Sequence, residues 1–343
     1  MRTISSKLLL LLAAFLFVLT ACGGNDTSTD SEPATVVVTT NILGDVVRQV
    51  AGDQVNVETI MPAGADPHVF QASAKQVDLM MKADLLISNG ESFEERLLDV
   101  LASAKEDGVP VFEAMSHVRT IEFGEDDHAG HDDHDDHDDH DDHDDHDDHD
   151  DHAGHDHSGV DPHFFTDPLQ MVEVVEALVD FMIANVSGID ADQLRASGDS
   201  YVQQLQDLHD EIQEMFEAVP AGKRVLVTNH EVFNYFAEQY DFEIVGTVIP
   251  SLSTTDSASA KQLTELMEVI ESHHVPAIFA DVASSDRLAA MIAEEIGEIG
   301  VVNLYSESLG EAGSGASTYL DMLRTNYERI ATALAAEGHD HDH

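Results

Sequence analysis

Residues 35–60 read TVVVTTNILGDVVRQVAGDQVNVETI, and this stretch sets the pattern that most of the chain follows. Residues 35–40 form a β-branched run that is typical of a strand. Residues 42–51 form an amphipathic stretch that ends at Gly52, as a helix often does. A second strand pattern follows at residues 55–60. Strand, helix and strand in this order predict a parallel βαβ unit.

The same alternation continues along the chain. Before residue 125 it predicts helices at residues 73–82 and 93–104 and strands at residues 84–88 and 109–112. From residue 168 it predicts helices at 168–186 and 197–219, then strands at 224–228, 243–248, 277–280 and 301–304 that alternate with helices at 231–239, 258–271, 285–296 and 317–336. Strands that alternate with helices of about ten residues indicate parallel sheets covered on both faces. We therefore expect an α/β fold with two similar four-stranded parallel-sheet lobes.

The expected domain organisation places these elements in two lobes joined by a long, rigid helix. The N-terminal αβ lobe covers residues 35–190, the linking helix residues 191–219, and the C-terminal αβ lobe residues 220–336. A helix of about 20 residues runs roughly 30 Å, which is long enough to cross from one lobe to the other. A low-complexity insertion at residues 125–159 interrupts the first lobe, and a short His/Asp tail occupies residues 337–343.

The first residues have the pattern of an export signal. Two basic residues precede an apolar run at residues 8–19, which is too short to span a bilayer comfortably. Cys22 is the only cysteine in the chain, and its place after this run resembles the lipobox of bacterial lipoproteins. We therefore expect a signal peptide at residues 1–21, lipidation at Cys22, and a flexible tether at residues 22–34. The protein would then be anchored to the cell membrane on its extracytoplasmic face, in the periplasm or at the cell surface.

Residues 125–157 form a tract built almost entirely of histidine and aspartate. The tract offers almost no apolar area to offset its ordering entropy, so we expect it to be disordered. Imidazole and carboxylate groups are ligands of first-row metals, which favours a flexible metal collector over a plain acidic linker. Its eleven candidate accessory ligands are His128, His131, His134, His137, His140, His143, His146, His149, His152, His155 and His157.

The charge of the chain excludes some partners. The formal net charge is −53, and removing the 18 acidic residues of the tract leaves −35 for the remainder. A nucleic-acid partner is not expected, because such a surface repels phosphate. Cations would be attracted to it. A habitat of high salt, which screens self-repulsion, is an alternative cause of this acidity.

Three histidines outside the tract and tail lie where an αβ fold carries function. His68 and His163 each end an Asp-Pro-His tripeptide, and His230 follows the strand predicted at residues 224–228. Ligands bind beyond the carboxyl ends of strands in open αβ sheets, and loops there carry function. The remaining histidines have weaker contexts: His209 is expected on a helix surface, His273 and His274 in a solvated loop, and His117 has no assigned role.

These residues fall in motifs that resemble a known family. From about residue 35 to residue 336, the chain resembles the metal-binding solute-binding proteins of bacterial ABC importers, in the cluster A-I group for zinc and manganese. The motifs are TNIL at residues 40–43, MPAGADPH at 61–68, DPH at 161–163, VTNH at 227–230 and NLYSESLG at 303–310. Zinc-importing members of the family also tend to carry a His/Asp-rich loop just before the second ligand.

The resemblance implies one metal ion at the lobe interface. By position, His68 and His163 would come from the first lobe, and His230 with an acid near residues 304–309 would come from the second. Glu307 stands where the family commonly has aspartate, and Asp281 or a water molecule is the alternative fourth ligand. Histidine as third ligand is typical of zinc members, and three imidazoles with one carboxylate suit tetrahedral Zn²⁺.

The leading hypothesis is therefore a monomeric zinc receptor that is held at the membrane by its lipid and delivers Zn²⁺ to an ABC permease. No catalysis is required. Manganese or iron uptake, extracellular metal buffering or adhesion without transport, and a zinc hydrolase are the alternatives. The hydrolase is the weakest of these, because the sequence has no HExxH motif. Asn41, Asn229 and Asp66 are candidate partners that could orient the imidazoles.

Overall fold

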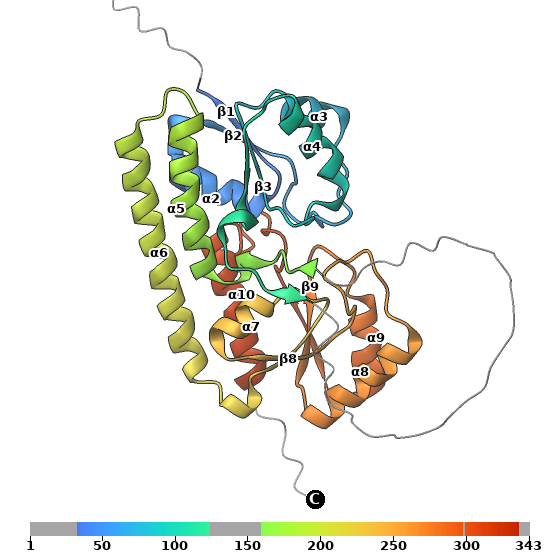
Figure 1. The fold of residues 1–343 in the computed structure, drawn as a ribbon. Helices are drawn as coiled ribbons and strands as arrows, with labels where there is room; N and C mark the ends of the chain where they lie inside the picture. Colours follow the sequence, from blue (N-terminus) through green and yellow to red (C-terminus); the bar gives the residue numbers. More distant parts are fainter. Residues whose placement is uncertain (1–32, 124–158, 298, 336–343) are drawn as a thin grey trace, which may run out of the picture. The chain divides into compact units, whose positions relative to one another are not determined.

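Two four-stranded parallel sheets organise the computed structural model, which describes residues 33–123, 159–297 and 299–335 (Figure 1). The first sheet has the order β2-β1-β3-β4, with β1 at Thr35–Val38, β2 at Asn56–Thr59, β3 at Leu85–Ser88 and β4 at Val111–Glu113. The second has the order β10-β9-β7-β8, with β7 at Val225–Thr228, β8 at Glu243–Thr247, β9 at Ala277–Asp281 and β10 at Gly300–Leu304. Counted within its own half of the chain, each sheet has the strand order 2-1-3-4. This repeated topology confirms the expected α/β fold with two similar sheets.

Helices cover both faces of each sheet (Figure 1). Those associated with the first sheet are α2 (Asn41–Ala51), α3 (Ala74–Met81), α4 (Leu98–Glu106) and α5 (Pro168–Asn185). Those associated with the second are α7 (Asn234–Tyr240), α8 (Ala260–His273), α9 (Arg287–Ile296) and α10 (Tyr319–Ala335). The long helix α6 (Ala191–Glu217) lies between the two series in the sequence.

The side chains of β1 show why the first sheet is covered on both faces. Val36, Val37 and Val38 are all fully buried. Val36 and Val38 pack in the core cluster that includes α2 and α5, whereas Val37 packs with Met80 of α3 and the residue Leu97 just before α4. Successive side chains of a strand point to opposite faces, so one apolar run serves two cores.

The second sheet repeats this division. Leu226 of β7 and Phe279 of β9 join the cluster that contains α7 and α10. Val227 and Ile278, which follow and precede them in the same strands, pack with residues of α8 and α9. The central strands of both sheets, β1, β3, β7 and β9, are therefore buried on two sides, as parallel sheets require.

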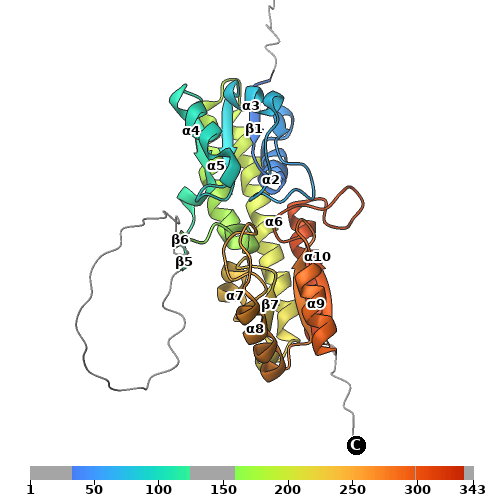
Figure 2. The same ribbon diagram turned by 90° about the vertical axis from the view of Figure 1, so that its right-hand side faces the viewer.

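Helix α6 contacts elements from both halves of the chain. Its N-cap is Asp190, whose carboxylate accepts hydrogen bonds from the backbone N–H groups of Asp192 and Gln193. The helix therefore begins at Ala191, six residues before the start of the helix predicted at residue 197. It packs against α2 and α5 from the first half and against α10 from the second (Figure 2). The expected long connecting helix is thus present.

A short antiparallel strand pair was not predicted. It joins β5 (Glu122–Phe123) to β6 (Gly159–Val160), which flank the His/Asp tract (Figure 2). The backbone N–H of Asp161 extends the pair by donating to the carbonyl oxygen of Ile121 at 2.9 Å. Each strand has two residues, which is too short for a periodic pattern. The pair fixes the chain immediately before His163.

The helix predicted at residues 93–104 begins later in the structure. Residues Glu91 and Ser92 have left-handed backbones with φ of 48° and 60°, and a 3₁₀ turn at Glu95–Leu97 precedes α4. The buried Glu94 carboxylate holds this turn by accepting hydrogen bonds from the Thr39 hydroxyl and the Asn89 backbone N–H. A side chain from a distant strand end thus overrides the local helical pattern.

The predicted signal peptide, Cys22, the tether up to residue 32, the eleven tract histidines and the His/Asp tail lie outside the described residues. Within the described ranges, no helix is long and apolar enough to cross a membrane.

Candidate metal site

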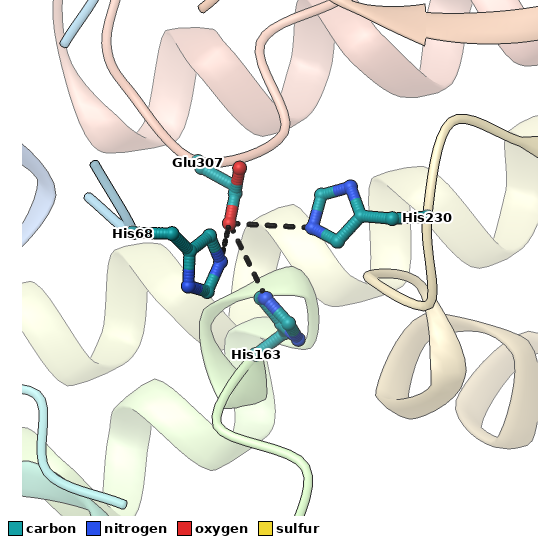
Figure 3. Close-up of side chains that lie close together, drawn as sticks. All are labelled: His68, His163, His230 and Glu307. Carbon is teal, nitrogen blue, oxygen red and sulfur yellow. Dashed lines mark hydrogen bonds and ion pairs between the residues drawn. The ribbon is translucent and has the colours of Figure 1, made fainter. Parts of the chain in front are cut away.

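Four side chains predicted from separate motifs lie together in the structure (Figure 3). His68 follows β2, His163 precedes the short 3₁₀ turn Phe164–Thr166, His230 follows β7, and Glu307 follows β10. One potential ligand atom from each lies within 4.8 Å of the other three. All four side chains are at most 2% exposed. The site is thus built where loops leave the carboxyl ends of β2, β7 and β10, as predicted for this fold.

The three imidazoles converge on one oxygen of Glu307. The Nε2 atom of His68 lies 2.8 Å from Glu307 Oε1, and the Nε2 atoms of His163 and His230 lie 3.3 Å from the same oxygen (Figure 3). The ring centroids of the histidines are 5.3 to 5.9 Å apart. Three nitrogen donors and one carboxylate therefore face a common centre.

Several buried polar atoms at this centre have no hydrogen-bond partner. They are His163 Nε2, both ring nitrogens of His230, and Glu307 Oε2. The contacts at 3.3 Å thus bring the groups close without hydrogen-bond geometry. Buried unpaired polar atoms are costly, and native proteins keep few of them without a functional reason. The orphaned atoms fit a site whose remaining partner is a cation.

The charges of Glu307 and His68 depend on each other. Burial by itself would raise the pKa of the Glu307 carboxyl, but interaction with the His230 and His68 rings holds that pKa well below its usual range. Burial would likewise lower the pKa of His68. The charge of Glu307 and the hydrogen bonds with Glu307 and Glu95 instead raise the pKa of His68 to about 10. Glu307 is therefore a carboxylate that favours a cation at the centre.

The other two histidines differ from each other in their electrostatics. Burial opposes the charged form of His163, but the charge of Asp161 raises its pKa. Burial lowers the pKa of His230, although Glu307 acts in the opposite direction. His230 is therefore the imidazole that is most readily neutral, which is the form that binds a metal.

Two carboxylates orient imidazole rings by contacting the Nδ1 atom, while the Nε2 atom faces the common centre. The Nδ1 atom of His163 lies 2.7 Å from Asp161 Oδ1, and the Nδ1 atom of His68 lies 3.1 Å from Glu95 Oε1. Because a carboxylate only accepts, each Nδ1 carries the proton and each Nε2 faces the centre. Such carboxylate–histidine pairs fix the ring and its tautomer at metal sites.

The two Asp-Pro-His tripeptides share one local geometry. In each, the aspartate Oδ1 accepts a hydrogen bond at 2.9 Å from the backbone N–H of the histidine two residues later. This is the turn that aspartate stabilises by bonding its own backbone. The aspartates then differ, because Asp161 also bonds the His163 ring, whereas Asp66 accepts from the Thr254 hydroxyl at 2.7 Å.

The candidate orienting residues named from the sequence do not contact the rings. Asn41 bonds the loop around Glu307, and Asn229 donates to the Ser284 hydroxyl. Asp66 stabilises the backbone before His68 rather than the ring. Glu95 was missed because 27 residues separate it from His68 and its motif is not distinctive.

Asp281, the alternative fourth ligand, is not among the four grouped residues. Its carboxylate instead accepts hydrogen bonds from the Ser306 hydroxyl and from the backbone N–H groups of Ala283 and Ser284. Burial and the charge of Glu307 raise the pKa of Asp281 to about 7. Asp281 thus supports the loop that carries Glu307.

The histidines with weaker sequence contexts lie elsewhere. His117 stacks on Phe112, His209 lies 3.1 Å from the Tyr240 hydroxyl through its Nδ1 atom, and His273 and His274 are exposed at the end of α8. None of them belongs to the group that contains His68.

Known proteins match this chain over the region that contains the four grouped side chains. The family model described as zinc-uptake complex component A, periplasmic (ZnuA), matches residues 36–333, which span both sheets and all four grouped side chains. The chain belongs to the ZnuA family. Together with the relatives below, this makes it the metal-binding, substrate-binding component of an ABC importer.

Relatives of this ZnuA-family chain differ in the metal that their names give. It is 27% identical to the zinc-binding protein TroA of Treponema pallidum, over 92% of this chain and 93% of that protein. It is 28% identical to the manganese-binding lipoprotein MntA of Bacillus subtilis, over 94% of this chain and 98% of that protein. The lipoproteins among the relatives indicate an extracytoplasmic location.

Solved structures agree with the fold. The periplasmic zinc-binding protein TroA of Treponema pallidum superimposes with a TM-score of 0.72 at 24% identity, covering 88% of this chain and 99% of that one. A manganese-bound periplasmic protein from Candidatus Liberibacter asiaticus gives a TM-score of 0.70 at 23% identity, with the same coverage. At such identities the superpositions establish the fold and leave the metal open.

Proposed function

We propose that this protein is a zinc receptor that captures Zn²⁺ outside the cytoplasmic membrane and delivers it to an ABC permease. The observation that carries the proposal is the buried group of three imidazoles and one carboxylate. In this proposal His68, His163, His230 and Glu307 are the four ligands of the transported ion.

The chemistry of this set favours zinc over manganese. Zn²⁺ accepts four nitrogen and oxygen ligands in a tetrahedron, at about 2.0–2.2 Å. Mn²⁺ prefers carboxylate, carbonyl and water oxygens. His230 is the residue that favours zinc over manganese here, because an acid at this position would give the site two carboxylates and more oxygen ligands. Glu307, one methylene longer than the aspartate expected there, reaches within 2.8 Å of the His68 ring.

The geometry disfavours hydrolysis. A catalytic zinc keeps an open coordination position for water and needs a general base. Here four potential ligands face one centre, and each is at most 2% exposed. A closed set of this kind suits capture and release of the ion.

The tract and the N-terminal cysteine complete the proposal. Lipid at Cys22 would hold the monomeric receptor near its permease, and the eleven tract histidines would collect Zn²⁺ a few residues before His163. Their sites should be weaker than the central one, since a flexible chain loses more entropy on binding. Deleting residues 126–157 should remove weak zinc equivalents and leave one tight equivalent. Loss of the tight equivalent would contradict this division.

Competitive titration tests the metal assignment. The protein and its His230→Glu variant are titrated with Zn²⁺ and Mn²⁺ against a chelator of known affinity, with His209→Ala as the control. We expect the unchanged protein to prefer zinc, and His230→Glu to shift the preference towards manganese by at least about tenfold. His209→Ala should match the unchanged protein. A manganese preference in the unchanged protein would favour manganese uptake instead.

A further inference from the structure

The loop that carries Glu307 is held on both sides by side chains that do not face the metal centre. On the side of the second sheet, Asn326 Oδ1 accepts from the backbone N–H of Tyr305 at 2.8 Å, and Asp281 accepts from the Ser306 hydroxyl. On the other side the contacts come from α2 and the loop after β2, in the first half of the chain. Glu307 is thus fixed between two halves of the sequence.

Asn41, in the first turn of α2, makes two of these contacts and a third hydrogen bond to the loop after β2. Its Nδ2 donates to Ser308 Oγ at 2.8 Å and to the Pro62 carbonyl oxygen at 2.9 Å, and its Oδ1 accepts from the Leu309 backbone N–H at 2.7 Å. The amide therefore uses its donor and acceptor sides on the two residues that follow Glu307. Asn41 is only 9% exposed, so water competes little for these bonds.

Ser308 extends the connection to the loop that carries His68. Its hydroxyl oxygen, which is fully buried, also accepts from the backbone N–H of Gly64 at 2.8 Å. Gly64 has a φ of 73°, a left-handed backbone conformation that favours glycine at this turn. One serine thus joins the loop of His68 to the loop of Glu307.

From these contacts we infer that Asn41 is a positioning residue for metal binding, which acts by holding Glu307 at the imidazoles. The inference rests on the proposed function of Glu307 as a ligand. Two bonds from one amide restrain residues 308 and 309, and a third ties that amide to the carbonyl oxygen of Pro62, so the backbone of Glu307 loses freedom before metal arrives. A ligand that is held in place loses less entropy on binding. Residues that hydrogen-bond to metal ligands typically change metal affinity by about 10- to 100-fold when they are mutated.

A double-mutant cycle on the full chain tests whether Asn41 acts through Glu307. Zinc affinity of the tight site is measured by chelator competition for Asn41→Ala, Glu307→Ala and the double variant. We expect Asn41→Ala to lower affinity about 10- to 100-fold alone, and less than about threefold when Glu307 is already alanine. A merely structural residue would produce the same loss in both backgrounds, and that result would overturn the inference.

Asp45→Ala is the matched control. Asp45 lies one turn after Asn41 on the same helix, and its Oδ2 accepts from the backbone N–H of Tyr319 at 2.8 Å, so it also joins α2 to the second half of the chain. Its side-chain hydrogen bonds go to Tyr319 and Gln49, and none goes to residues 305–309. Asp45→Ala should lower the free energy of unfolding while zinc affinity stays within about threefold. An equal affinity loss in Asp45→Ala and Asn41→Ala would also overturn the role of Asn41.

The zinc affinities of the same variants also show whether Glu307 is a ligand at all. If Glu307→Ala binds zinc as tightly as the unchanged protein, Glu307 is not a ligand, and the positioning role falls with it. If Glu307→Ala loses affinity while Asn41→Ala does not, the ligand set stands and the inference about Asn41 is wrong.

Discussion

The three imidazoles at the centre differ in whether the Nδ1 atom has a hydrogen-bond partner. Asp161 supports His163 at 2.7 Å and Glu95 supports His68 at 3.1 Å, whereas Nδ1 of His230 has no hydrogen-bond partner. Two rings are therefore held by carboxylates and one is held by packing alone. The difference makes the supporting acids testable separately from the proposed ligands.

Glu95→Gln should weaken zinc binding about 10- to 100-fold while leaving the fold intact. The amide cannot supply the negative charge that holds Nδ1–H of His68, so the ring loses part of its orientation and basicity. Isothermal titration with Zn²⁺ measures the effect. Asp99→Asn, an exposed change on the following helix, is the control and should be neutral. Unchanged affinity in Glu95→Gln would show that packing alone orients His68.

Zinc binding should release protons at pH 8. The pKa of His68 is raised to about 10 in the metal-free protein, so the ring still carries its extra proton at this pH and must lose it to bind zinc. Affinity should therefore rise with pH and fall as pH drops, by up to about tenfold per pH unit for each proton released. Calorimetry at pH 8 in buffers of different ionisation enthalpy counts the protons. A count of zero would contradict the raised pKa.

At the scale of residues, the sequence identified the four grouped side chains but not how they are held, and Asn41, named as a partner of the imidazoles, bonds the loop of Glu307 instead. His68 and His230 follow predicted strands, and His163 repeats the Asp-Pro-His motif of His68, so these three positions could be read locally. Glu95 and Asn41 act on partners 27 and 268 residues away. Such contacts depend on how the loops meet, and no local pattern encodes them.

At the scale of elements, α5 and α6 approach closely at a glycine. A Cβ atom added to Gly198 of α6 would lie 2.7 Å from Val179 Cγ2 of α5, which is closer than real side chains allow. Alanine normally stabilises a helix interior by up to about 1 kcal/mol relative to glycine. Here steric conflict should outweigh that gain.

Gly198→Ala should therefore lower the free energy of unfolding, with a steric cost of about 1–3 kcal/mol. Val179→Ala removes the conflicting methyl groups, so the double variant should be more stable than the sum of the two single effects predicts, by at least about 0.5 kcal/mol. Urea unfolding of the four proteins completes the cycle. A stabilised Gly198→Ala variant would mean that the helices shift apart without cost.

The elements that the sequence predicted well are those with long periodic patterns. The apolar runs of the sheets and the extended face of α6 repeat often enough to be recognised. The start of α4 could not be predicted, because the left-handed residues Glu91 and Ser92 depend on the buried Glu94. The β5–β6 pair escaped prediction because its strands pair across the whole tract.

At the scale of the whole molecule, the grouped side chains come from both sides of α6 in the sequence. His68 and His163 precede the helix, and His230 and Glu307 follow it. A metal bound to all four would join segments that are otherwise linked through side-chain contacts such as the Ser253 hydroxyl with Glu95. Binding should therefore stabilise the fold as a whole, since the unfolded chain cannot hold the four groups together.

Zn²⁺ should accordingly raise the unfolding temperature of a variant that lacks residues 126–157, in which the tract cannot contribute. The expected gain is about 1.4 kcal/mol for each tenfold excess of free zinc over the dissociation constant. Differential scanning calorimetry over a series of buffered zinc concentrations measures the shift.

In the same background, Glu307→Ala should lose most of the shift, because the pKa of this buried carboxyl is held low and it supplies the negative charge that a divalent cation needs. Mg²⁺ at matched concentrations should leave the unfolding temperature unchanged, because it prefers six oxygen ligands. An equal zinc-induced shift with and without Glu307 would place the stabilising zinc elsewhere.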